Sequence, residues 1–383
     1  MRRRVTLREV AAAAGVSTKT VSRVISGGAT VAPATMEIVL QAIKELDYHP
    51  DEAARSLRSG KDNSVGLVVD SLLDPFFAEL AGIIEARLFE WGLLTIVAST
   101  GQSAERERQL LRTMVSRKVS ALAIVPSPNG EYGWLHGFDI PLFFLDRIAE
   151  VPGARSIVVD EISNARAATR HLIGGGHTRI AFISDRPDLY TLRLREEGFR
   201  LAMAAAGIEI DERLVRLDCG GRSGAELVTT DLVRSAEPPT AIFSSNTVTS
   251  LGMVAALHAT NTTHIAHLSY GDFTLARDLL PAVTVVDHEG RQIGAAAAGQ
   301  IVAALGLTQA ATPPACDPAA ALGLDHSWVS TADLAVATPI SVAPSTVDGD
   351  VIFVPARLIA RGSGEQPPNT HRPSAREEED SRV

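Results

Sequence analysis

The sequence predicts an α/β protein: a small all-α unit at the N-terminus, followed by a two-lobed body built on parallel sheets. Three observations predict this architecture. Two short helices flank a glycine-containing turn within the first thirty residues, and beyond residue 63 short apolar runs alternate with amphipathic stretches. The 383 residues also suffice for two or three domains, each with its own core.

The composition is that of an ordinary globular protein, with 45% hydrophobic and 21% charged residues. No apolar run approaches the roughly 20 residues of a membrane helix, and no signal-peptide core follows the basic residues 2–4. We therefore expect a cytoplasmic protein with no membrane partner. Cys219 and Cys316 form neither a disulfide framework nor a metal knuckle, so no metal or other cofactor is expected.

The charge is distributed unevenly along the chain. Residues 1–61 contain ten Lys/Arg and six Asp/Glu, a net charge of +4. The remainder of the chain has a net charge of −13, and the two parts sum to the total of −9. Because affinity for phosphates depends on a local basic patch, the N-terminal unit is a candidate for binding nucleic acid.

Local signals place two helices in this unit. Thr6 and Glu9 form a capping box before a helix over residues 7–14, Gly15 permits a tight turn, and Ser17 caps a second helix over residues 18–26. The apolar positions recur at helical spacing and let the helices face each other: Val10 and Ala14, then Val21 and Val24. This is the helix-turn-helix pattern, with an ordinary helical hairpin as the alternative.

The outward face of the second helix favours DNA. It carries polar and basic donors that suit a major groove: Thr18, Lys19, Thr20, Ser22 and Arg23. Lys19 and Arg23 are four residues apart and share a face. A third helix is expected after Pro33, since proline suits a first helical turn.

These motifs resemble the headpiece of the LacI/GalR family of bacterial transcriptional repressors. The resemblance rests on TLREVA at residues 6–11, AGVS at 14–17, TVSRV at 20–24, LDYHP at 46–50 and AARSLR at 53–58. It departs from the family at Asp51, where asparagine is usual, and at Ala32, where serine commonly caps the third helix.

The resemblance implies roles for individual residues. Thr18, Lys19 and Arg23 match base-reading positions, while Thr6, Ser17, Thr20 and Ser22 match positions at or near phosphate. Residues 54–57, with Ala54 and Leu57, match a hinge helix whose leucine wedges into the minor groove. So short a helix cannot be stable alone, so we expect it to fold on DNA beside its symmetry mate. The partners implied are a double-stranded palindromic operator and a second copy of the chain, in the nucleoid.

The body predicts parallel sheets covered by helices on both faces. The apolar runs are residues 65–69, 93–98, 121–125, 142–145, 157–159, 180–183, 241–243 and 283–286, and helical stretches include 76–91, 105–116, 164–173, 192–206 and 248–259. A ligand would lie between the lobes, at the carboxyl ends of strands. No dinucleotide or phosphate-loop fingerprint follows the first strand.

The family resemblance continues through residue 306 and again over 351–363. It implies a periplasmic-binding-protein-like module, with chain crossings between lobes near Asp160, Asp287 and one final strand. It also implies effector-binding residues: Phe76 and Phe77 stacking on a sugar-like ligand, Asp146 and Arg195 bonding its polar groups, and Asn246 contacting it from the second lobe. The alternatives are core packing for both phenylalanines, and a strand-end turn or ion pair for Asp146.

Several positions depart from the family's sugar-gripping pattern: Thr247, Gly271, His288 and Cys219. These departures argue against a standard hexose. An Arg fork and a carboxylate suit hydroxyl-rich or carboxylate ligands.

The predicted domains are a headpiece over residues 1–50, a hinge and linker over 51–62, and the effector-binding and dimerisation module over 63–363. Residues 308–350 are expected to be a disordered insertion, and 364–383 a disordered tail.

Three functions remain open. A dimeric, ligand-gated repressor is favoured over a tetramer, since no C-terminal leucine heptad is visible. A regulator that binds DNA constitutively is the second, and a ligand-binding protein or sugar enzyme with an incidental hairpin the third. An enzyme is not expected, because no nucleophile elbow is present. The His264/His267 spacing is a poor metal site, since strand geometry points the two rings to opposite faces.

Overall fold

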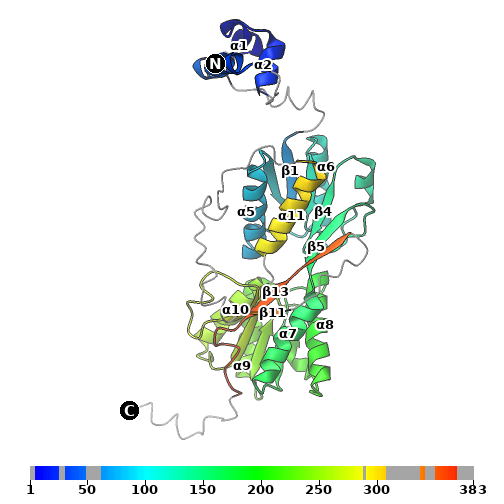
Figure 1. Cartoon of the computed structure of the whole chain (residues 1–383). Helices are drawn as coiled ribbons and strands as arrows, with labels where there is room; N and C mark the ends of the chain where they lie inside the picture. The colour runs from blue at the N-terminus through cyan, green and yellow to red at the C-terminus, as the bar shows by residue number, and fades with distance from the viewer. Residues whose placement is uncertain are drawn as a thin grey trace. The chain divides into compact units, whose positions relative to one another are not determined.

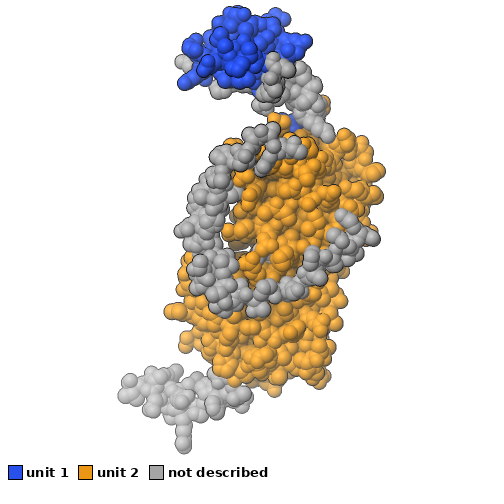
Figure 2. Space-filling model, in the orientation of Figure 1, with its two compact units in different colours: residues 1–62 blue, residues 63–383 orange. Residues whose placement is uncertain are grey.

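The computed structural model describes residues 5–25, 31–48, 62–287, 290–307, 337–340 and 350–368. The chain divides into two compact units, residues 1–62 and residues 63–383 (Figure 2). No described helix combines the length and the apolar character that crossing a bilayer requires.

Unit 1 contains three helices: α1 (Leu7–Ala13), α2 (Thr18–Ile25) and α3 (Pro33–Glu45). The predicted capping box is present: the Thr6 amide donates to Glu9 Oε2 at 2.7 Å, and the Glu9 amide to Thr6 Oγ1 at 3.4 Å. Gly15 has φ +64°, the left-handed turn expected of it. The predicted apolar stripes meet α3 in one small core around Val21. The helix-turn-helix is therefore confirmed.

The first lobe of unit 2 is a six-stranded parallel sheet in the order β12-β5-β4-β3-β1-β2. Its strands are β1 (Ser64–Val69), β2 (Leu94–Ser99), β3 (Ala121–Ile124), β4 (Leu142–Leu145), β5 (Arg155–Val159) and β12 (Val351–Val354). Its helices are α5 (Pro75–Phe89), α6 (Ala104–Ser116) and α11 (Gly290–Ala304), with the 3-10 helix η1 (Gly133–Gly137). Leu67 packs with α5 and α11, which lie side by side (Figure 1), whereas Val68 packs with α6. The sheet is therefore buried on both faces, which explains its nearly continuous apolar strands.

The second lobe is a seven-stranded sheet in the order β11-β13-β10-β9-β8-β6-β7. Its strands are β6 (Ile180–Ile183), β7 (Val215–Arg216), β8 (Ala241–Ser244), β9 (Ala266–Tyr270), β10 (Thr284–Asp287), β11 (Ala337–Ile340) and β13 (Ala356–Ile359). Its helices are α7 (Glu161–Gly174), α8 (Tyr190–Ala205), α9 (Gly221–Arg234) and α10 (Thr247–Ala259), with the 3-10 helix η2 (Glu212–Leu214). Phe182 packs against α7 and α8, and Ile183 against α9 and α10.

The chain crosses between the lobes at the three predicted places, but the prediction of a single final strand is wrong. The segment forms two strands separated by Pro355: β12 pairs with β5 in the first sheet, and β13 pairs antiparallel with β10 in the second. Proline lacks the amide that would continue a ladder, so the chain can leave one sheet here and enter the other. Figure 1 shows this orange segment running from one lobe into the other.

Two segments expected to be disordered contain ordered structure. Residues 337–340 form β11 because they add antiparallel to β13 at the sheet edge. At the start of the tail, Glu365 Oε2 accepts hydrogen bonds from Thr284 Oγ1 at 2.8 Å and from the Gly362 amide at 2.6 Å. His177 Nε2 donates to the Gln366 carbonyl at 2.8 Å. The rest of the insertion and tail, like the hinge and His288, lies outside the described residues.

Candidate functional sites

The first candidate site is the outer face of α2. Thr18, Lys19 and Arg23 are exposed, while Val21 and Val24 on the opposite face are buried in the unit 1 core. Packing of the apolar stripe therefore fixes which face is presented to a partner. All three predicted base-reading side chains are therefore exposed, and their contact with bases stays a prediction.

The predicted phosphate-contacting residues first serve the helices themselves. Thr6 caps α1, and Ser17 Oγ accepts from the Thr20 amide at 3.1 Å and lies 2.9 Å from Thr20 Oγ1. Thr6 and Ser17 are exposed, and Thr20 and Ser22 are half-buried. Ala54 and Leu57 lie outside the described residues, so the hinge remains an expectation.

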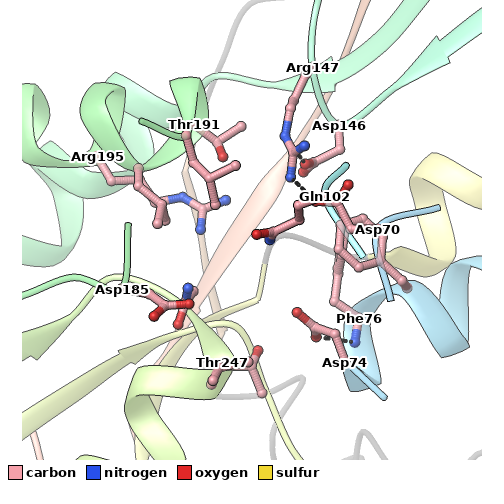
Figure 3. A pocket seen from close by; sticks show the side chains of 15 residues that line it. Asp70, Asp74, Phe76, Gln102, Asp146, Arg147, Asp185, Thr191, Arg195 and Thr247 are labelled. Carbon is pink, nitrogen blue, oxygen red and sulfur yellow. Dashed lines mark hydrogen bonds and ion pairs between the residues drawn. The ribbon is translucent and has the colours of Figure 1, made fainter. Parts of the chain in front are cut away.

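The second candidate site is a cavity between the two lobes of unit 2 (Figure 3). Its lining follows the carboxyl ends of parallel strands, the place predicted for a ligand. The first lobe contributes Asp70, Asp74, Phe76, Phe77, Gln102, Asp146 and Arg147, and the second Asp185, Leu189, Thr191, Leu192, Arg195, Asn246, Thr247 and Val248. All five residues predicted to bind an effector are among them.

Arg147 is a lining residue that the sequence reasoning did not nominate. Its Nη2 lies 2.5 Å from Asp70 Oδ2, its Nε 3.3 Å from Asp146 Oδ2, and its Nη1 donates to the Pro126 carbonyl at 2.6 Å. Its position directly after Asp146, at a strand end, was the available signal. Arg147 holds two buried carboxylates at the wall of the cavity.

Arg195 is anchored in the second lobe. Its Nε and Nη2 donate to the two Glu161 carboxylate oxygens at 2.8 and 2.6 Å, and its Nη1 donates to the Ser245 carbonyl at 2.8 Å. The guanidinium lies 3.9 Å from the Tyr270 ring centroid. Burial alone would lower the pKa of Arg195, but the Glu161 charge raises it above its usual value. Three of five N–H donors are thus occupied, leaving two for other partners.

Asp146 has both structural roles that the sequence offered as alternatives to ligand binding, a strand-end turn and an ion pair. It has φ +66° at the end of β4 and pairs with Arg147. It is 5% exposed, and burial raises its pKa to about 6, with Arg147 opposing the rise and Glu161 adding to it. At neutral pH Asp146 is therefore an ionised carboxylate at the cavity wall, although its buried surroundings favour the protonated form.

Replacing Asp146 by asparagine should stabilise the protein at neutral pH. Because its folded pKa of about 6 exceeds 3.8, its stabilising contribution is complete below pH 3.8 and disappears as the pH rises through 6. We expect a gain of less than about 3 kcal/mol at pH 7.5 and a smaller gain at pH 5. Urea unfolding at both pH values measures this gain in the free energy of unfolding. Asparagine is the chosen replacement because it tolerates the left-handed backbone of residue 146.

An equal gain at the two pH values would contradict this account, since it would not track ionisation of Asp146. His267 is another shifted group that titrates in the acid range, because burial lowers its pKa to about 4. Its stabilising contribution is lost as the pH falls below 6.5 toward 4, the opposite trend. His267 is present in both proteins, so its effect cancels from the difference.

The two phenylalanines differ in their surroundings. Phe77 is 6% exposed and belongs to the core around α5 and α11, so core packing accounts for it. Phe76 is only partly buried, and its ring meets that of Phe77 edge-on at 5.0 Å. A Cβ at Gly290 would lie 3.2 Å from Phe76 Cδ2, so the start of α11 supports this ring.

Asn246 caps α10: its Oδ1 accepts from the Thr249 amide at 2.8 Å. Its side-chain NH₂ is therefore the group that could serve a ligand. Gly271 is not in the lining, and its amide donates to the Val286 carbonyl at 2.8 Å. Among the described side chains, no group of three His, Cys, Asp or Glu could hold a metal ion.

Two protein-family models and known repressors match this chain. The family model for periplasmic binding proteins and sugar binding domain of LacI family matches residues 62–313, and that for bacterial regulatory proteins, lacI family, matches residues 6–51. The HTH-type transcriptional repressor PurR of Vibrio parahaemolyticus is 30% identical over 298 residues, which cover 76% of this chain and 88% of the relative.

Solved structures agree. A lac repressor dimer bound to operator and an anti-inducer has a TM-score of 0.73 and 20% identity, covering 94% of this chain and 99% of that one, and shows the shared fold. A complex of the transcriptional regulator CelR with cellobiose has a TM-score of 0.56 and 30% identity, covering 81% and 95%. This chain therefore belongs to the LacI family of bacterial regulatory proteins, as a DNA-binding transcriptional repressor with an effector-binding domain.

Proposed function

We propose that this repressor binds a palindromic operator as a homodimer, reading bases with Thr18, Lys19 and Arg23. The observation that carries the proposal is the exposed polar face of α2, held outward by the buried Val21 and Val24. A dimer would present two such helices to two half-sites, one or more helical turns apart. Residues 1–61 have a net charge of +4, which favours phosphate contact.

The affinity for operator would be set by a polar small molecule in the cavity between the lobes. An occupant there would touch Phe76, Asp146 and Asn246, which belong to both lobes, so it would favour one interlobe geometry over another. Arg186 of the second lobe also donates to Gln102 of the first, a contact that depends on the same geometry. The related CelR was solved with cellobiose, which supports a sugar-like class of effector.

Selection of bound sequences from a random duplex pool tests the DNA-binding proposal. Wild type should enrich a palindrome, and Arg23→Ala should bind it about 5- to 150-fold more weakly, the range for a lost base contact. Leu57→Ala should also weaken it. Lys44→Ala is the matched control. It removes one positive charge from an exposed position of α3, and it should leave the enriched sequence unchanged.

Failure to enrich any sequence at low salt, where phosphate contacts are strongest, would contradict operator recognition. Enrichment of a single half-site without symmetry would contradict the homodimer. Equal losses for Arg23→Ala and Lys44→Ala would mean that the side chain at residue 23 contributes charge and not base reading.

A second candidate function is DNA binding that no effector changes. It is favoured by the hydrogen bonds of Arg195 to Glu161 and to the Ser245 carbonyl, which occupy three of the five guanidinium N–H donors within the protein. Titration of the selected operator complex with metabolites distinguishes the two: a ligand that shifts operator affinity at least severalfold excludes constitutive binding.

A further inference from the structure

The cavity between the lobes is lined by more acidic than basic side chains. Four carboxylates face it, Asp70, Asp74, Asp146 and Asp185, against the two cations Arg147 and Arg195. Glu161, behind the wall, already pairs bidentately with Arg195. Five carboxylates therefore accompany two arginines, a formal charge of −3. The neighbouring Arg186 adds nothing, because it pairs with Asp188.

The acidic side chains are not all satisfied within the protein. Asp70 is 1% exposed, and while its Oδ2 holds Arg147, its buried Oδ1 has no hydrogen-bond partner. Asp74 uses one oxygen to cap α5, accepting from the Phe76 amide at 3.0 Å. Burial raises the pKa of Asp74, and the charge of Asp70 adds to the rise. A buried acceptor without a donor is costly, so the lining calls for a donor from outside.

Both arginines of the lining are committed, which argues against an anionic effector. Arg147 holds Asp70 and Asp146, and Arg195 holds Glu161. A carboxylate or phosphate entering here would meet like charges, with no cation free of a carboxylate partner among the described lining residues. This revises the sequence-based expectation that a carboxylate ligand would suit the site.

A metal ion is equally unsuited, since no three acidic or histidine side chains in the described parts of the chain converge on one point. The carboxylates are instead spread over both lobes, so they fit an organic cation that spans the space between them. Phe76 adds an aromatic ring to the wall, a surface that favours carbon chains and ammonium groups.

We propose that the effector of this cavity carries a protonated amine, whose N–H groups bond the lining carboxylates. The inference rests on the proposed function of the cavity as the effector site. An amino sugar and an aliphatic diamine share this chemistry, and the test separates them.

Matched ligand pairs in which an amine replaces each hydroxyl under comparison, at one position in the sugars and at both ends of the diol, test the inference on the full-length protein. Glucose and glucosamine, galactose and galactosamine, and 1,4-butanediol and putrescine would be compared by calorimetry, with glucuronate as the anion. We expect at least one amine to bind about tenfold or more tightly than its hydroxyl partner. Binding by the hexosamines or by putrescine then identifies the source.

Asp74→Asn supplies the test on the protein side. Asparagine still caps a helix, so this variant removes charge and keeps α5. Binding of the amine should weaken by about tenfold, whereas Glu209→Gln, which neutralises an exposed carboxylate of the second lobe, should change it less than about twofold. Ligand-free Asp74→Asn should also melt at a higher temperature than wild type, since like charges in the cavity are reduced.

Three results would overturn the inference. These are equal or tighter binding of the neutral partner, binding of glucuronate, and no binding by any of the amines. In each case operator selection with Arg23→Ala still decides the DNA-binding part of the proposed function, because it does not involve the cavity, and titration of the operator complex with other metabolites still decides whether the cavity is an effector site. The two proposals can therefore fail separately.

Discussion

Arg195→Met is expected to lower the free energy of unfolding by about 3–5 kcal/mol, the effect of removing one partner of a buried ion pair. The side chains of Arg195 and Glu161 are 5% and 2% exposed. Without the guanidinium, the buried Glu161 carboxylate beside the Tyr270 hydroxyl would lose its cation partner, and the Ser245 carbonyl would lose its donor. Equilibrium urea unfolding followed by circular dichroism measures the loss.

Two controls identify the cause. The double variant Arg195→Met with Glu161→Gln removes both charges and should recover at least half of the loss, since no unpaired buried charge remains. Arg200→Met lies on the same helix and breaks a bidentate pair with the exposed Glu212, so it should cost less than about 1 kcal/mol. If the double variant is no more stable than Arg195→Met, lost packing and not charge explains the effect.

Gly252→Ala is expected to destabilise the protein by about 3 kcal/mol, because α9 and α10 touch at this position. A Cβ there would lie 2.2 Å from the Arg222 carbonyl oxygen and 2.9 Å from the Glu226 amide nitrogen. Both are backbone atoms of α9, so no side-chain rotation can relieve the contact. The helices must move apart, and this opens the core that they share around Met253.

The matched control is Gly299→Ala. Gly299 lies inside α11, is exposed, and a Cβ there would meet nothing within 4 Å. Alanine should therefore raise the free energy of unfolding by about 0.5–1 kcal/mol through backbone entropy alone. Thermal or urea unfolding of the two variants should give changes of opposite sign. Destabilisation by both would point to a general intolerance of glycine replacement and would contradict the packing argument.

Much of the fold was predictable because its signals are local. The capping box and Gly15 act within a few residues, so they predict the helix-turn-helix without knowledge of the rest of the chain. Buried parallel strands are apolar on both faces, so strands such as β1 are visible as short runs. Not every strand is visible in this way: β7, β9 and β11 have no predicted run. In β9 the buried His267 and Ser269 interrupt the apolar pattern while forming hydrogen bonds inside the lobe.

The positions of the candidate residues were also predictable, but the ion pairs that they form were not. Family motifs led to Asp146 and Arg195, and both line the cavity. Asp146 pairs with the adjacent Arg147, which also holds Asp70 from 77 residues away. Arg195 pairs with Glu161, 34 residues away. Spacing of this kind carries no periodic signal, so neither Asp70 nor Glu161 was nominated.

The sequence by itself determined most of the helices and strands, the basic headpiece and the face of α2 that its apolar stripe leaves exposed. Hydrogen bonds and apolar stripes within one or two turns are sufficient for those features. Only the tertiary structure decided which carboxylates share the cavity, that Arg195 is committed to Glu161, and that Pro355 divides the last segment between two sheets. These depend on burial and on charges brought together from distant parts of the chain, and the energy of a buried charge is set by all its neighbours at once.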